Sequence, residues 1–133
     1  MSKAGVRGAL TLLSALTGVV LLVIGVRFLL VPQQASRLFG LAPTSAPGSF
    51  DLHYVIGLRD IWLAAILAVL TVLQDWRGLA IWLGFGMLVC VGDAAIAVHS
   101  SGKPLPVAFH LASGIFCAAL SAACWRQYRT PGK

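Results

Sequence analysis

Two residue types, glutamate and asparagine, are missing from the chain altogether. The absence of asparagine excludes N-linked glycosylation, since the acceptor motif begins with that residue. The absence of glutamate leaves four aspartates as the only side-chain carboxylates: Asp51, Asp60, Asp75 and Asp93. Any carboxylate chemistry in this protein must therefore use aspartate.

Charge is also scarce. Charged residues make up 11% of the chain and hydrophobic residues 59%, with a mean hydropathy of +0.90, whereas about a quarter of an ordinary soluble domain is charged. This composition predicts an integral membrane protein with the lipid bilayer as its surroundings. At about 20 residues per span, we expect the 133 residues to form one four-helix domain over 1–133, without a separate soluble domain.

Cysteine is limited to Cys90, Cys117 and Cys124, all in apolar segments and without the C-x-x-C spacing. An odd number of cysteines without a ligand pattern argues against a disulfide framework and against a zinc site. We therefore expect these residues to pack as small apolar side chains, and we expect no metal and no other cofactor.

Long apolar runs predict an all-α, antiparallel bundle with spans over about 8–31, 50–73, 78–98 and 105–125. Pro32 ends the first span because proline lacks the amide that a continuing helix needs. The segment 32–41 alternates apolar and polar residues in a way that predicts a short amphipathic helix in the membrane interface.

The net charge of +6 arises from cations near the ends of the spans rather than on one soluble face, so we exclude a nucleic-acid partner. Most of them lie before the first span, between the second and third, and after the fourth. By the positive-inside rule, this pattern predicts a multi-pass protein of the cell membrane with both termini in the cytoplasm.

Five ionisable residues lie at a similar depth in four different spans: Arg27, Arg59, Asp60, Asp93 and His110. Each is about 6–9 Å inside a span end, at ~1.5 Å per residue. Charges at such depth are costly, so they indicate a functional site by default. Helical spacing places Asp60, Asp93 and His110 on stripes of small residues that face the bundle interior. Arg59 points about 100° away from Asp60 and is expected to meet another helix.

A structural interpretation competes with the functional one. Two arginines, Arg27 and Arg59, balance two aspartates, as buried ions require, so the cluster could serve only to fix the register of the bundle. His53 and His99 lie near span ends, where the simplest expectation is a wetted interface residue.

Several motifs resemble a family of small four-helix membrane proteins of bacteria and fungi that is known only as a domain of unknown function. They are Pro32, Ala35, Phe39-Gly40, Gly57-Leu58-Arg59-Asp60, Gly92-Asp93 and His110. The resemblance extends from about Leu12 to Ala119. It implies a four-helix membrane fold but no established activity, and the position of fungal members beside small-molecule biosynthetic enzymes suggests lipophilic metabolites.

The first functional hypothesis is a cofactor-independent enzyme, an isomerase, cyclase or epoxide-opening enzyme, that uses acid–base chemistry on a lipophilic small molecule. Two carboxylates in different low-dielectric surroundings can act as acid and base. The expected catalytic residues are Asp60, Asp93 and His110, and the expected substrate-binding residues are Arg27, Arg59, His53 and Gly57.

Two alternatives remain open. Aspartate and histidine relays also serve proton-coupled transport, but four spans are few for a monomeric transporter, so a binding or transport module would require a homo-oligomer. Haem or quinone binding by His53, His99 or His110 would need two histidines at matching depth on facing helices.

Overall fold

The computed structural model describes residues 3–42 and 50–130, and within these ranges it contains helices and no strand. The helices are α1 (Lys3–Leu30), α2 (Pro32–Phe39), α3 (Asp51–Val72), α4 (Trp76–Ser100) and α5 (Pro104–Arg129). Four of them, all except α2, are long and apolar enough to cross a membrane. The predicted all-α bundle with a short helix after the first span is confirmed, and the four spans indicate a multi-pass membrane protein.

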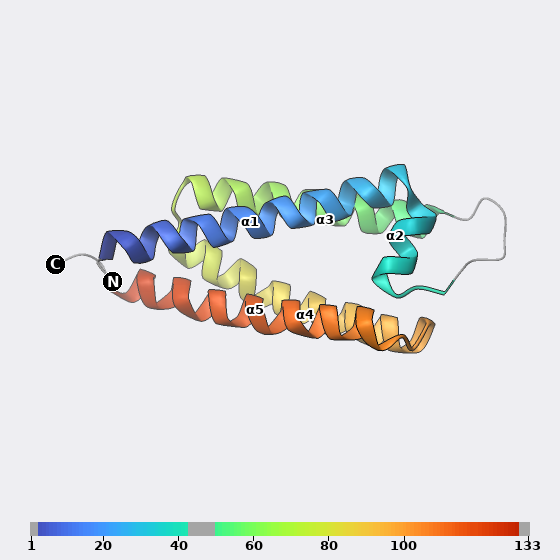
Figure 1. Cartoon of the computed structure of the whole chain (residues 1–133). Coiled ribbons are helices and arrows are strands. Elements are labelled where there is room, and N and C mark those ends of the chain that lie inside the picture. The colour runs from blue at the N-terminus through green and yellow to red at the C-terminus, as the bar shows by residue number, and fades with distance from the viewer. Residues whose placement is uncertain (1–2, 43–49, 131–133) are drawn as a thin grey trace.

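The four long helices form two close pairs rather than an evenly packed bundle. Helix α1 packs along α3, and α4 packs along α5, while the two pairs contact each other much less (Figure 1). Glycine allows the close approach of α1 and α3, because a Cβ added to Gly25 would lie only 2.7 Å from the carbonyl oxygen of Gly57. Small interface residues serve the same purpose in other membrane helices.

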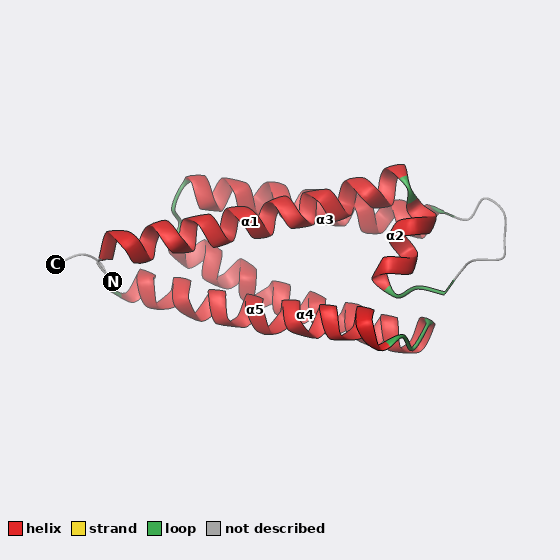
Figure 2. Cartoon of the chain, in the orientation of Figure 1, coloured by secondary structure: helices red, strands yellow, loops and turns green. Residues whose placement is uncertain are grey.

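Local sequence determines where the helices begin and end (Figure 2). Pro32 occupies the start of α2, where its missing N–H costs nothing. Gly40 follows α2 with a φ of +97°, a left-handed conformation that glycine adopts easily. Asp75 caps α4 by accepting a hydrogen bond from the amide of Gly78 at 3.0 Å, and the turn before it places α3 and α4 antiparallel.

Helix α2 folds back across one end of the bundle (Figure 1), which we call the α2 end; the opposite end, where α1 begins and α5 ends, is the terminal end. The ring of Phe39 lies edge-on to that of Phe28 in α1, with centroids 5.6 Å apart. At Gly40, an added Cβ would lie 2.8 Å from Pro106 and 2.9 Å from Ala97. The chain after α1 thus bridges from the first helix pair to the second.

The buried apolar residues form two separate cores. The core at the terminal end draws on all four long helices and includes Leu10, Leu67, Leu79, Leu83 and Leu120. The smaller core at the α2 end consists of Phe28, Ala35 and Phe39. The core at the terminal end joins the two helix pairs, whereas at the α2 end the second pair is reached through Phe39, which contacts His110, and Gly40, which lies against Ala97 and Pro106.

Candidate functional site

Arg59 is the centre of the polar cluster. Its Nε donates to Oδ1 of Asp60 at 2.9 Å, and its two Nη atoms donate to Oδ1 and Oδ2 of Asp93, both at 3.1 Å. The planar guanidinium suits this arrangement because its N–H groups point in fixed directions that match a carboxylate. Asp60 and Asp93 are only 3% and 8% exposed, which confirms that both face the interior within reach of Arg59.

This cluster joins the two helix pairs. Arg59 belongs to α3 and Asp93 to α4, so the expected contact with another helix is confirmed, while Nε also binds Asp60 on the same helix. The interpretation that two arginines share two aspartates is wrong, since Arg59 holds both carboxylates. Arg27 is exposed and makes no ion pair with any residue in 3–42 or 50–130. One cation between two carboxylates leaves a formal local charge of −1.

His110 is held at the same site from α5. Its ring is 6% exposed, and Nε2 lies 3.0 Å from the carbonyl oxygen of Phe39. A carbonyl oxygen only accepts hydrogen bonds, so we assign the proton to Nε2 and leave Nδ1 as the acceptor of the neutral ring. The Phe39 ring also contacts the imidazole, with centroids 4.5 Å apart. Helix α2 therefore fixes both the tautomer and the orientation of His110.

Two titratable atoms of the cluster remain available. Within the described residues, Oδ2 of Asp60 and Nδ1 of His110 have no hydrogen-bond partner, and neither is a fully buried atom. Both oxygens of Asp93, in contrast, are engaged by Arg59.

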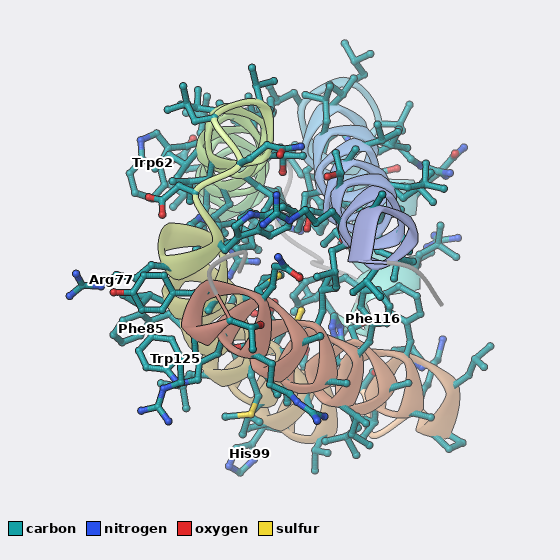
Figure 3. All side chains as sticks on the ribbon, turned by 90° about the vertical axis from the view of Figure 1, so that its left-hand side faces the viewer. Trp62, Arg77, Phe85, His99, Phe116 and Trp125 are labelled. Atoms are coloured by element: carbon teal, nitrogen blue, oxygen red, sulfur yellow. The ribbon has the colours of Figure 1, made fainter. Side chains whose placement is uncertain are left out.

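A cavity of about 1500 Å³ lies between the two helix pairs, and Arg59, Asp60, Asp93 and His110 are among the polar residues of its wall. Most of the remaining wall is apolar. Trp62 and Phe85 project on the side of α3 and α4, while Phe116 lies on the opposite side, towards α1 (Figure 3). All three line the cavity and are exposed at the surface, so the cavity reaches the membrane-facing surface of the bundle.

Not every predicted site residue lines this cavity. His53 is 5% exposed and packs against the rings of Phe28 and Phe50, so the expectation that it is a wetted interface residue is wrong. Gly57 lies in the contact between α1 and α3. His99 is exposed and points away from the bundle (Figure 3), as expected for an interface residue.

The family model described as domain of unknown function DUF4267 matches residues 18–124. The chain belongs to this family. The matched region of the DUF4267 domain contains Arg27, Arg59, Asp60, Asp93 and His110, and it confirms the family resemblance seen in the motifs. Searches of curated proteins and of solved structures found no match.

Sequence reasoning missed two features of this DUF4267 member. Cys90 of α4 and Cys117 of α5 both line the cavity. Their helical spacing from Asp93 and His110 places them on the same interior-facing stripes, and this spacing could have identified them from the sequence. The cations Arg37 and Lys103 also line the cavity, and nothing in the sequence pattern indicates this for Arg37, because it depends on how α2 folds back.

The DUF4267 domain offers no evident metal centre in the part that the structure describes, where no three histidine, cysteine or aspartate side chains are grouped to hold an ion. The chemistry of the site therefore has to be derived from Asp60, His110 and the Arg59 bridge. These groups can accept, donate and stabilise charge, but they include no activated serine or cysteine nucleophile beside a base.

Proposed function

We propose that this protein is a membrane enzyme that uses acid–base chemistry on a lipophilic small molecule, as an isomerase, cyclase or epoxide-opening enzyme. The observation that carries the proposal is the position of Oδ2 of Asp60 and Nδ1 of His110. Both residues line one large, mostly apolar cavity, and both atoms are without a partner in the described structure. An apolar cavity with a few convergent polar groups is the usual form of a small-molecule site.

In this proposal Asp60 removes a proton from the substrate while His110, in its doubly protonated form, supplies one from Nδ1 and keeps the Nε2 hydrogen bond to Phe39. The proton taken up by Asp60 then returns to Nδ1, which restores both groups for the next turnover. An ionised Asp60 is held by Nε of Arg59, so its free oxygen has a fixed direction. His110 is fixed by Phe39 with Nδ1 available. Positioned general acids and bases typically contribute about 10²–10⁴-fold to a rate.

Arg59 and Asp93 have supporting roles in this mechanism. Three of the five guanidinium N–H groups of Arg59 bind carboxylates, which leaves two donors for negative charge that develops on a substrate oxygen. Asp93 positions the guanidinium by holding both Nη atoms. We therefore propose that Asp93 positions Arg59, in place of the catalytic role that the sequence led us to expect.

The proposal is tested by a readout that needs no known substrate. Membranes with wild-type protein are incubated in buffered D₂O with total lipid extract, and lipophilic compounds that gain deuterium are detected by mass spectrometry. An acid–base isomerase incorporates solvent deuterium when its base returns a proton to carbon. We expect labelled compounds that require wild-type protein and fall at least about 100-fold with Asp60→Asn or His110→Gln.

The variants were selected to preserve the fold. An asparagine at 60 can still accept from Nε of Arg59, and a glutamine at 110 retains a donor for the Phe39 carbonyl. The matched control is Asp51→Asn, because Asp51 is an exposed residue of the same helix and should leave labelling unchanged. Labelling that persists in both site variants, or that never depends on the protein, would refute the proposal.

One observation favours a structural role as the second candidate. The Arg59–Asp93 contact connects α3 to α4 and so joins the two helix pairs apart from the core at the terminal end. A pure clamp predicts that Asp93→Asn lowers stability and that no compound gains deuterium. A binding or transport module would instead bind lipophilic molecules without labelling them, and with four spans it would act as a homo-oligomer.

A further inference from the structure

Three cations surround the cavity at the α2 end. Arg27 comes from the last turn of α1, Arg37 from α2, and Lys103 directly precedes α5. All three line the cavity and are exposed. Within residues 3–42 and 50–130, none of these side chains makes an ion pair or a hydrogen bond, so the cations are available for a ligand.

The cavity extends from these cations towards the terminal end along an apolar wall. On α4 the wall continues from Asp93 back to Gly78, a separation of 15 residues or about 22 Å of helix. It includes Ile81, Phe85 and Val89. The cavity therefore has a cationic end and a long apolar body, and its two parts differ in the ligand chemistry that they favour.

We propose that the ligand of this cavity is a single-chain anionic amphiphile, with a carboxylate or phosphate head at Arg27 and Arg37 and its hydrocarbon chain along the apolar wall. This inference rests on the proposed function, because it names the substrate class of the same cavity. Guanidinium groups bind carboxylate and phosphate oxygens in a matching planar geometry. Lys103 adds a third positive charge without that directionality.

The charge of the inner cluster determines the orientation of the ligand. Arg59 is shared by two carboxylates, so the site around Asp60 carries a formal charge of −1 and repels an anionic head. The head consequently stays at the α2 end, and a neutral part of the chain lies beside Asp60 and His110. This orientation agrees with a reaction on carbon atoms of the chain rather than on the head.

Quenching of tryptophan fluorescence by brominated lipids tests the proposal. Trp62 and Trp82 line the cavity, so a bound bromine atom quenches them. Purified full-length protein in neutral detergent at pH 8 is titrated with dibromostearic acid and with its methyl ester, which has the same chain but no charge. We expect the acid to bind at least about tenfold more tightly than the ester.

The cations are tested with a double variant and a matched control. Arg27→Gln/Arg37→Gln should reduce the preference for the acid to less than about threefold while retaining ester binding. Arg7→Gln/Arg126→Gln removes two exposed cations near the terminal end and should leave the preference unchanged. Hexadecyl phosphate should displace the brominated acid, whereas inorganic phosphate at the same concentration should not, which distinguishes an amphiphile from a free anion.

Equal binding of acid and ester, an equal effect of the control variant, or full displacement by inorganic phosphate would each overturn the inference. Its failure is separable from failure of the proposed function. If deuterium labelling depends on Asp60 but the acid has no preference, the enzyme proposal stands and the anionic ligand is wrong. If the acid binds selectively to wild type and to Asp60→Asn alike and nothing is labelled, the ligand class stands without catalysis.

Discussion

Replacement of Arg59 by glutamine should be among the most destabilising single changes in this protein. The substitution removes three hydrogen bonds to carboxylates and leaves Asp60 and Asp93 buried without a cation. Breaking a buried ion pair from one side costs about 3–5 kcal/mol. We expect Arg59→Gln to lower the free energy of unfolding by that amount, measured by titrating mixed micelles with SDS and following the helical circular dichroism signal.

Two further variants test the cause of that loss. Arg59→Lys keeps the charge but cannot bind two carboxylates with a planar fork, so its cost should be intermediate. Adding Asp93→Asn to Arg59→Gln removes one of the stranded charges and should recover about 0.5–3 kcal/mol. A gain in stability when the second partner is also replaced is expected if the loss came from an unpaired buried charge. If the loss came from packing, the second substitution would lower the stability further.

The control for this series is Arg77→Gln. Arg77 is exposed and makes no ion pair with a described residue, so its replacement should change stability by less than about 0.5 kcal/mol. Two results would refute the reasoning. One is a free energy of unfolding for Arg59→Gln that lies within about 1 kcal/mol of that of the control. The other is a further loss of stability when Asp93→Asn is added to Arg59→Gln.

Two more stability changes are expected in the same SDS titration. Gly25→Ala should lower the free energy of unfolding by about 1–3 kcal/mol, because the new Cβ would lie 2.7 Å from the carbonyl oxygen of Gly57. The control is Gly92→Ala, which has nothing within 4 Å of the new atom and should cost nothing. Equal losses for the two variants would contradict the close α1–α3 contact. Asp75→Ala should lower the free energy of unfolding by about 0.5–2 kcal/mol through loss of the α4 cap. Asp51→Ala removes no side-chain cap bond and should leave the stability unchanged. An unchanged stability for Asp75→Ala would show that the α4 cap is dispensable.

The fold could be predicted because a membrane constrains it strongly. Apolar runs of span length leave few structures other than helices, and Pro32 determines where the first one stops. Depth and helical spacing also identified Arg59, Asp60, Asp93 and His110 as one cluster. Run length, depth within a span and helical spacing depend only on positions along the chain, so the sequence alone contains them.

The pairing within the site could not be predicted in the same way. Whether Arg27 or Arg59 meets Asp93 depends on the rotation of α1 and α3 about their axes and on the tight Gly25–Gly57 contact. The hydrogen bond from His110 to Phe39 depends on α2 folding back over the end of the bundle. Both are consequences of tertiary packing, so composition and periodicity do not contain them. That both ends of the chain face the cytoplasm stays a prediction.

The division into two helix pairs has a consequence for the order of assembly. Helices α1 and α3 precede α4 and α5 in the chain, so each pair consists of helices that can associate before the two pairs join. Until Asp93 of α4 meets Arg59 of α3, its carboxylate lies in the membrane without a cation; a charged aspartate costs about 2.5–3.5 kcal/mol at a helix centre, which is an upper bound for Asp93. Relief of that cost favours the joining of the pairs, so substitutions at Arg59 or Asp93 act on the last step of assembly rather than on insertion of the spans.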